Sequence, residues 1–323
     1  MQDMKNNNAK EPLNEKRAAD NKALLDSLSR ADIVLSHPDK RKRNANGFLR
    51  SFFMFVFALV FVASAFNIVI SSVSRSKTDK FYEGLRDAFY SGDISQDGTD
   101  YLAREIMAAD TRLVNDDGTV FTHTSGTLSM KEKYELMLPN LDALASLNAN
   151  AFAWIKVDGT RVDYPIVKGN DNSYYLDHAL DRTYSVSGSV FIDYMNSKKL
   201  SQNRNTCVYG HNMNDGTMFQ TIMNFKNKNQ FKNGKIEIYT KEGIYVYTPF
   251  AAYESDPYFY FFYTEFPTDE YFSQFLSDIK EKSMHESDIT PTATDKIVTL
   301  ITCTNTVEDK RCVVHGVLDE IIK

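Results

Sequence analysis

The distribution of apolar and polar positions divides the chain into four parts. Residues 1–50 are mostly polar, Phe52 to Ile70 is a run of 19 residues without a charge, and apolar positions then recur first at helical and later at strand spacing. An apolar stretch of about 20 residues is long enough to cross a bilayer as a helix. The pattern predicts a tail over 1–50, a transmembrane anchor over 51–71, a helical stalk over 72–134 and a folded domain over 135–323.

The tail is rich in Asn, Lys and Asp and carries one amphipathic patch, from Ala23 to Leu35. That patch could form a short helix that docks a partner or lies on the inner membrane surface. The composition of the whole tail favours a largely disordered segment.

Basic residues flank the apolar run unequally. Lys40 to Arg43 and Arg50 precede it, whereas those from Arg75 to Lys80 are sparser. The positive-inside rule therefore predicts a cytoplasmic N-terminus and an external C-terminal body. The alternative is a cleaved signal peptide, since Ala63-Ser64-Ala65 has the form of a cleavage site. We favour an uncleaved anchor, because about 50 residues precede the run and apolar residues continue to Ile70.

The stalk contains apolar stripes at helical spacing, within Phe81 to Phe89 and within Tyr101 to Met107, and a third stripe runs from Tyr134 to Leu147. Polar stretches rich in Gly, Asp, Ser and Thr separate them, over 91–100 and 115–126. We interpret the stripes as packing surfaces.

Short apolar runs bounded by turn residues follow from Phe152 onward. They cover Trp154–Val157, Val162–Val167, Ser189–Asp193, Thr206–Tyr209, Lys235–Tyr239, Gly243–Tyr253, Lys296–Thr302 and Arg311–Ile322. Eight such runs predict a mainly β domain, an antiparallel barrel or sandwich. A helix over Asp269 to His285 interrupts the series between the sixth and seventh strands.

Composition adds little, since 42% hydrophobic and 25% charged residues are ordinary for a globular protein. The distribution of charge is more informative. Residues 1–50 hold 11 Lys and Arg against 7 Asp and Glu, and the whole chain carries −6, so the remaining 273 residues carry −10. An acidic body argues against a nucleic-acid partner.

Candidate chemistry gathers on the last two strands. Cys303 ends one of them and Arg311 begins the next, so a thiol and a guanidinium can meet at one rim. A fixed positive charge favours the nucleophilic thiolate and can bind the oxyanion that forms when it attacks a carbonyl. His211, which closes the Thr206–Tyr209 run, is the best candidate for the acid–base group. Each residue alone is more often a buried small side chain or a surface charge.

The other cysteines and histidines suit packing better. Cys207 and Cys312 are predicted to lie in the core, so at most one disulfide can form among three cysteines. His315 shares a strand face with Arg311 and is the one rival to His211, although its position suggests a packed or edge histidine. No CxxC spacing occurs, so the sequence predicts no zinc site and no cofactor.

Taken together, these residues resemble a known family. Thr299-Leu300-Ile301-Thr302-Cys303 resembles the T-L-x-T-C signature of sortases, Tyr209-Gly210-His211-Asn212 resembles the histidine segment of their class B members, and Arg311 stands where their arginine stands. Further segments follow the class B pattern in order: Asn148–Ile155, Asp163–Val167, Asn172–Leu176, Gly188–Tyr194 and Met218–Phe219.

The resemblance implies an eight-stranded sortase barrel with N-terminal helices, a helix between strands 6 and 7, and a catalytic domain over 135–323. It also implies transpeptidation. Cys303 attacks the threonine carbonyl of a C-terminal sorting signal, His211 protonates the leaving amine, and Arg311 stabilises the oxyanion or orients the substrate. An amine of a peptidoglycan precursor then resolves the thioacyl enzyme. The implied partners are exported surface proteins and the cell wall, and the implied location is the cell membrane with the catalytic domain outside.

Substrate contacts follow from the same resemblance. Asn172 and Leu176 stand where family members contact the sorting peptide, and Tyr209 precedes the histidine. Phe261 and Phe262 belong to an aromatic run, 258–263, that could either wall an apolar groove or cover the barrel.

Other functions remain open at this stage. The same thioacyl chemistry serves a pilin polymerase, which uses a lysine of another subunit, and a thiol protease, in which water resolves the intermediate. A catalytically dead adhesion or scaffold module on a membrane anchor is the alternative outside enzymes.

Overall fold

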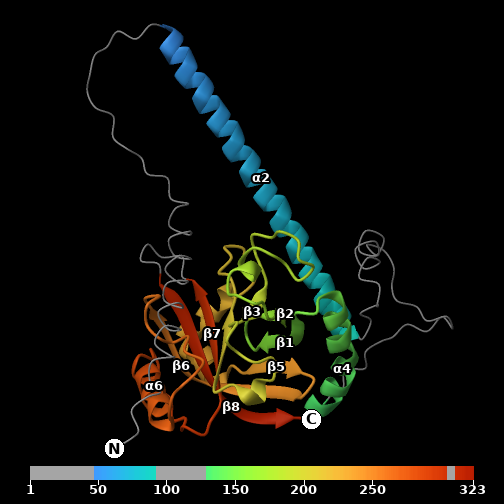
Figure 1. Cartoon of the computed structure of the whole chain (residues 1–323), viewed down its shortest axis with the longest axis vertical. Helices are drawn as coiled ribbons and strands as arrows, with labels where there is room; N and C mark the ends of the chain where they lie inside the picture. Colours follow the sequence, from blue (N-terminus) through green and yellow to red (C-terminus); the bar gives the residue numbers. More distant parts are fainter. Residues whose placement is uncertain (1–46, 92–128, 304–309) are drawn as a thin grey trace, which may run out of the picture. The chain divides into compact units, whose positions relative to one another are not determined.

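The computed structural model describes residues 47–91, 129–303 and 310–323 (Figure 1). Residues 1–46 of the predicted tail and the stripe from Tyr101 to Met107 lie outside the described residues, while residues 47–50 begin the first described helix. The chain forms two compact units, Met1–Phe66 and Asn67–Lys323. We describe each by itself.

The first described element is one helix of 45 residues, α2 (Gly47–Ser91). No proline interrupts it, and it holds both the predicted anchor and the stripe from Phe81 to Phe89. Within the described residues it is the one helix that is long and apolar enough to cross a membrane. Large apolar side chains on its first part, such as Phe57 and Phe61, are each 73% exposed. Such exposure is unusual for a protein surrounded by water and suits a lipid environment.

The last turns of α2 belong to the second unit and pack on its barrel. Tyr82, Leu85 and Phe89 are buried, and the Phe89 ring stacks on Trp154 with centroids 4.1 Å apart. The Tyr82 hydroxyl donates a hydrogen bond to the carbonyl of Gly188 at 3.2 Å. This end of the predicted stalk is therefore part of the core of the folded unit. The boundary at residue 135 stays a prediction.

The helix α4 (Met130–Leu147) confirms the third predicted stripe. It starts with a capping box, in which Ser129 Oγ accepts from the Glu132 amide and the Glu132 carboxylate accepts from the Ser129 amide. Its buried face, with Leu141 and Leu144, joins the core of the barrel.

The eight predicted strands are confirmed and form a closed barrel in the order β1-β2-β3-β4-β7-β8-β6-β5. They are β1 (Ala151–Val157), β2 (Asp163–Val167), β3 (Val190–Ile192), β4 (Asn205–Tyr209), β5 (Ile236–Thr240), β6 (Gly243–Ser255), β7 (Ile297–Cys303) and β8 (Arg311–Ile322). Short helices lie between them: η2 (Tyr174–Leu176), η3 (Leu200–Gln202), η4 (Gln220–Lys226) and α5 (Lys228–Asn233).

The prediction of antiparallel pairing is wrong at two places, because β2 pairs with β3 and β4 pairs with β7 in parallel. Parallel neighbours need a long crossover. Between β4 and β7 this crossover contains η4, α5, β5, β6 and the helix α6 (Asp269–Glu281). The connection returns the chain to the same end of the barrel, so both strands run in one direction.

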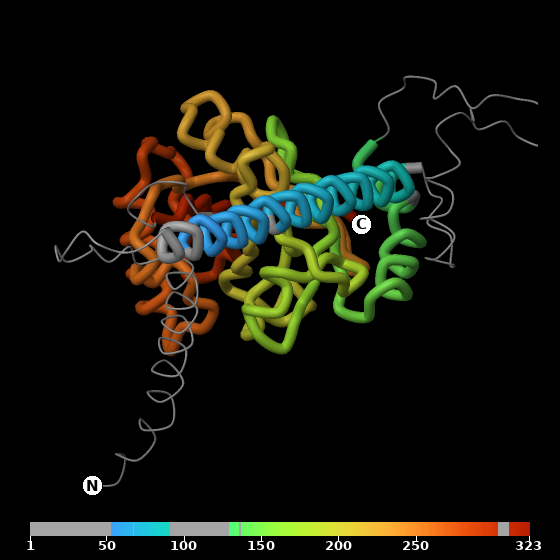
Figure 2. The backbone as a smooth tube through the Cα atoms, turned by 90° about the horizontal axis from the view of Figure 1, so that it is seen from above, coloured from blue at the N-terminus to red at the C-terminus, as the bar shows by residue number. Residues whose placement is uncertain are grey.

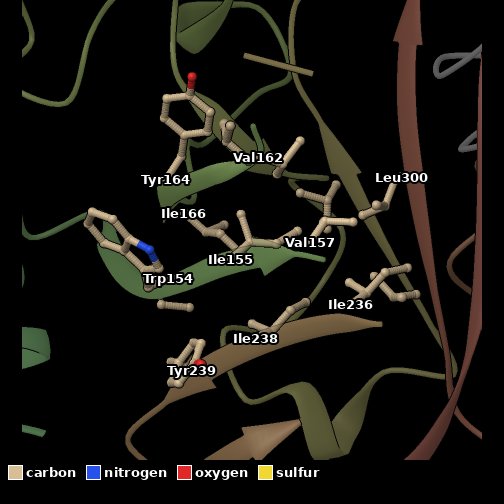
Figure 3. Close-up of a cluster of buried hydrophobic side chains, with 14 of the residues drawn as sticks. Trp154, Ile155, Val157, Val162, Tyr164, Ile166, Ile236, Ile238, Tyr239 and Leu300 are labelled. Carbon is tan, nitrogen blue, oxygen red and sulfur yellow. The ribbon is translucent and has the colours of Figure 1, made fainter. Parts of the chain in front are cut away.

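Side chains from four strands fill the barrel interior. Figure 3 shows Ile155, Ile166, Ile238 and Leu300 converging from β1, β2, β5 and β7, and all four are fully buried. Burying a side chain of this size stabilises the fold by about 1.5–3 kcal/mol. This interior is a packed hydrophobic core.

The predicted helix between strands 6 and 7 is also confirmed as α6, although it ends at Glu281 instead of His285. Thr268 caps its N-terminus. Its apolar face is buried in what we call the α6-side cluster, which also draws on β4, β6, β7, β8 and the segment before α6: Cys207, Phe250, Ala251, Tyr253, Phe261, Phe272, Phe275, Leu276, Ile279, Ile297, Ile301, Val313 and Val317. The helices α4 and α6 lie on opposite sides of the barrel, as Figures 1 and 2 show.

Candidate active site

The strand pair β7–β8 places two of the candidate residues opposite each other. The two strands are antiparallel, and Cys303 pairs with Arg311 in the backbone register. The predicted strand pair is thus confirmed. Arg311 is partly buried, and one of its guanidinium N–H groups donates to the carbonyl of Lys310 at 3.4 Å.

The third candidate reaches the same edge through β4. This strand runs parallel to β7, with Tyr209 beside Ile301. Beyond the pairing, the Gly210 amide donates to the Ile301 carbonyl at 3.2 Å, and the Thr302 hydroxyl donates to the Gly210 carbonyl at 2.7 Å. Since parallel strands end at the same edge, His211 and Cys303 both lie where their strands end, with Thr302 linking the two segments.

A tight packing contact fixes the backbone around His211. A Cβ atom added to Gly210 would lie 2.5 Å from the ring of Phe219, so only glycine fits there. The Phe219 amide donates to the His211 carbonyl at 2.8 Å, and Asn212 forms a bridge with Met218. The loop after the histidine therefore folds back and holds it from both sides.

The imidazole of His211 has a defined tautomer. Its Nε2 lies 2.6 Å from the carbonyl oxygen of Leu176, in η2. A carbonyl only accepts hydrogen bonds, so Nε2 carries a proton and Nδ1 is the nitrogen that can take up and release one. Burial lowers the pKa of His211, while the Leu176 carbonyl and the charge of Asp177 oppose that shift. The neutral ring is thereby favoured near pH 7.

A buried carboxylate orients two of the predicted substrate-binding residues. Asp193 is fully buried after β3, and its Oδ2 accepts from Asn172 Nδ2 at 3.0 Å and from the Tyr209 hydroxyl at 2.9 Å. Its Oδ1 accepts from the Met195 amide at 2.9 Å. Asn172 Oδ1 in turn accepts from the Tyr194 amide. These bonds fix the side chains of Asn172 and Tyr209 beside the histidine segment.

The sequence reveals neither the role of the Asp193 carboxylate nor that of the Leu176 backbone carbonyl in this site. Asp193 was noted only as part of the Gly188–Tyr194 pattern, and its place in that pattern was the available signal. Leu176 stays a predicted substrate contact, and the structure adds a second role, since its backbone carbonyl holds His211. A backbone acceptor leaves no mark on side-chain identity.

The two predicted aromatic residues differ in exposure. Phe261 is buried in the α6-side cluster, together with Cys207 and Ile301, while Phe262 is partly buried and packs against that cluster. Tyr209 packs against the same cluster. The segment that carries them therefore packs on the side of the barrel that this cluster covers.

The remaining candidates are in the core, as predicted. Cys207 and Cys312 are buried, and burial raises the pKa of Cys312 to about 12, which makes it a poor nucleophile. His315 is fully buried, with both ring nitrogens bonded, to Tyr253 and to Thr299. In the described part of the chain, no group of three or more His, Cys, Asp or Glu side chains is arranged to hold a metal ion.

Comparison with known protein families gives a match. A model of the sortase domain matches residues 155–319. Sortase B of Staphylococcus aureus (strain NCTC 8325 / PS 47) is 34% identical over 175 residues, which cover 54% of this chain and 71% of that protein.

Solved structures agree with the sequence match. A mutant form of Clostridium perfringens sortase B has a TM-score of 0.56 at 32% identity and covers 60% of this chain and 92% of its own. A Staphylococcus aureus sortase B–substrate complex has a TM-score of 0.57 at 26% identity and covers 77% of this chain and 99% of its own. The predicted barrel with its added helix is the architecture of these proteins.

Proposed function

This chain belongs to the sortase family and is a class B cysteine transpeptidase, and from that premise we propose that it attaches exported proteins to the cell wall. Its substrate is a C-terminal sorting signal that it cleaves after threonine. Its acceptor is an amine of the cell-wall peptidoglycan. No cofactor takes part in this reaction.

We assign the catalytic roles to Cys303, His211 and Arg311. The Cys303 thiolate adds to the threonine carbonyl, and the oxyanion that forms is stabilised by the guanidinium of Arg311. His211 Nδ1 takes up the proton of the Cys303 thiol as the thiolate forms, and gives this proton to the leaving amine as the peptide bond breaks. An incoming amine then attacks the thioester, His211 takes its proton, and the thiolate leaves.

The observation that carries this assignment is the meeting of three segments at one edge of the barrel. The register pairs Cys303 with Arg311, and the bond from Thr302 to Gly210 joins the cysteine strand to the histidine segment. The stability of the barrel does not require a nucleophile, a cation and an acid–base group from separate strands to lie at the same edge. Attack of a thiol on a carbonyl does require these three groups to lie close together.

Substrate recognition is assigned to the side chains around Asp193. Asn172 uses one N–H and one lone pair in its bonds within the protein, and an amide carries a second of each. The second N–H and the second lone pair of Asn172 can bond a carbonyl and an amide of an extended peptide. Tyr209 and Phe262 supply apolar surface next to it. One of the similar structures is a sortase B–substrate complex, which supports a peptide site in this fold.

The enzyme acts at the membrane in this proposal. Helix α2 supplies an anchor long enough to span the bilayer. The cluster of basic residues ahead of it favours a cytoplasmic N-terminus and an external barrel. Such a tether would keep the barrel close to exported chains that are still held in the same membrane.

The test uses the full-length protein in detergent, as wild type and as Cys303→Ala. Each is incubated with fluorogenic peptides of the N/S-P-x-T-G/N type, with and without an added amine, and products are identified by mass. We expect cleavage and an amine adduct with the wild type only. Cleavage that persists in Cys303→Ala would refute the assignment. Hydrolysis without any adduct, whichever amine is offered, would reduce the function to that of a protease.

A lysine-bearing acceptor peptide separates the nearest rival. If a lysine side chain from a pilin-like sequence is used much faster than a peptidoglycan-type amine, the enzyme is a pilin polymerase. The opposite preference supports the cell-wall acceptor.

A further inference from the structure

Four buried polar side chains form a chain of hydrogen bonds away from the catalytic edge. The Tyr253 hydroxyl lies 2.8 Å from His315 Nε2, and His315 Nδ1 lies 2.9 Å from Thr299 Oγ1. Thr299 Oγ1 lies 2.6 Å from Asn205 Oδ1. All four residues are at most 4% exposed. Burying a polar group to this degree costs free energy unless the group is hydrogen-bonded, so this chain of hydrogen bonds needs an explanation.

The direction of every bond follows from one end. Asn205 Oδ1 can only accept, so the Thr299 hydroxyl donates to it. The same hydroxyl must then accept from His315, which puts the proton on Nδ1. Burial lowers the pKa of His315 to about 3, so the ring is neutral and Nε2 accepts from Tyr253. The relay therefore runs from Tyr253 through His315 and Thr299 to Asn205 with a single polarity.

The relay ends on the aromatic segment between β6 and α6. Asn205 Nδ2 donates to the carbonyl of Tyr263 at 2.8 Å and to that of Phe261 at 3.4 Å. The Cys207 thiol donates to the carbonyl between them, that of Phe262, at 3.4 Å. Two side chains of β4 thus hold three successive carbonyls of this segment.

The segment needs such support because it has no strand of its own. It leaves β6 after Ser255 and enters α6 at Asp269, and its first turn is held by the Asp256 carboxylate, which accepts from the amides of Tyr258 and Phe259. A connection without a strand partner is expected to be mobile unless side chains fix its backbone.

The strand that holds the segment also leads to the histidine. Asn205 and Cys207 lie on β4, which continues through Tyr209 to His211. Phe262 and Tyr209 both pack against the α6-side cluster. One strand therefore sets the position of the aromatic segment and of the acid–base residue together.

We propose that the relay Tyr253–His315–Thr299–Asn205, with Cys207, positions the aromatic segment as a wall of the peptide-binding groove and so determines substrate affinity. These are positioning residues, since none of them touches the reacting atoms. The inference rests on the proposed function for its consequence, although the order of the segment is a property of the fold alone.

The test compares Thr299→Val with Thr299→Ser in the full-length protein. Valine keeps the volume and removes the hydroxyl, which leaves His315 Nδ1 and Asn205 Oδ1 unpaired, whereas serine keeps the relay. Thr240→Val is the matched control, since the Thr240 hydroxyl is also buried and bonds the Gly243 carbonyl in the β5–β6 turn. Tyr253→Phe, which removes only the first donor, is the second variant in case Thr299→Val does not fold.

Hydrogen exchange measures the order of the segment without any substrate. We expect faster amide exchange in residues 256–264 in Thr299→Val, by about tenfold or more, as the loss of a buried hydrogen bond predicts. Thr299→Ser and Thr240→Val should leave this segment unchanged. Unchanged exchange in both Thr299→Val and Tyr253→Phe would overturn the proposal, and so would an equal increase throughout the barrel.

Kinetics then measures the consequence for substrate. We expect Thr299→Val to raise KM for the sorting peptide by about five- to tenfold with kcat within about twofold of the wild type, and Thr299→Ser to restore KM. A fall in kcat at constant KM would show a merely structural role. If the wild type itself lacks Cys303-dependent activity, the proposed function fails, while the exchange experiment still decides whether the relay orders the segment.

Discussion

Two histidines of this barrel show how differently one side chain can be used. His211 lies at the end of β4, partly buried, with Nε2 bonded to a backbone carbonyl. His315 lies within β8, fully buried, with both nitrogens bonded to hydroxyl groups. Burial lowers the pKa of both rings, but nearby groups oppose that shift only at His211.

The difference lies in the partners. A ring with both nitrogens bonded cannot exchange a proton without breaking the core around it, and burial disfavours the charged ring, which lowers the pKa of His315 to about 3. A ring anchored by Nε2 alone is held in place while Nδ1 remains available for proton transfer. The number of ring nitrogens that are already hydrogen-bonded within the protein therefore decides whether a histidine can transfer a proton, more than its exposure does.

The sharpest test of this contrast exchanges each histidine for glutamine. His211→Gln is expected to lower kcat by about a thousandfold with little change in stability, because an acid–base group is lost at a partly exposed position. His315→Gln should keep kcat within about twofold and lower the free energy of unfolding by about 1–3 kcal/mol, because buried partners lose their bonds. Peptide turnover and urea unfolding measure the two effects.

The contrast fails if the two variants behave alike. A strongly stabilised or strongly destabilised His211→Gln would mean that this ring is mainly a packing residue. A thousandfold loss of kcat in His315→Gln would contradict the assignment of proton transfer to His211.

The free energy of unfolding should also depend on pH differently in the wild type and in His315→Gln. The pKa of His315 is about 3 when folded and about 6.5 in the unfolded chain, so the unfolded state binds the extra proton between these values. The stabilisation is complete above pH 6.5 and is lost as the pH falls toward 3. The wild type should lose about 2 kcal/mol between pH 6.5 and 5 from this group, at about 1.4 kcal/mol per pH unit.

Urea unfolding at several pH values measures that slope. His315→Gln should show a flatter decline than the wild type over pH 5–6.5, and His211→Gln should flatten it less. Equal slopes in all three proteins would show that His315 is protonated in the folded state.

The smallest expected effect concerns the carboxylate beside His211. Asp193→Asn replaces one oxygen by an N–H₂ group, so the side chain can no longer accept on one side from Asn172 and Tyr209 and on the other from the Met195 amide. KM for the peptide should rise by about three- to fivefold with kcat nearly unchanged, in line with the loss of one oriented hydrogen bond. Asp181→Asn, at an exposed position, should leave both constants unchanged. Unchanged KM in Asp193→Asn would mean that the orientation of Asn172 and Tyr209 is set elsewhere.

Much of the fold could be predicted because its signals are local. The run from Ile297 to Cys303 alternates as a strand does, and the spacing of Phe272, Phe275 and Ile279 marks a helix. Strand pairing is not local. The parallel alignment of β4 with β7 depends on how a long crossover packs, and no pattern in either strand encodes it.

The candidate site divides in the same way. Residue types at set spacings drew attention to Cys303, His211 and Arg311, because nucleophiles and acid–base groups are side chains. The Leu176 carbonyl that selects the tautomer of His211 is a backbone group, and every residue carries one. The relay through His315 needs four side chains from four strands, β4, β6, β7 and β8, which only the folded chain brings together.

The bond between Thr302 and Gly210 joins residues 92 positions apart, and Arg311 comes later still. A ribosome adds about 5–20 residues each second, so roughly 5–20 s separate the synthesis of the histidine segment from that of β8. Throughout this interval the polypeptide has His211, to which we assign acid–base catalysis, but does not yet have β8. We therefore expect transpeptidase activity only after β8 has been synthesised. A polypeptide that ends before β8 should have no activity.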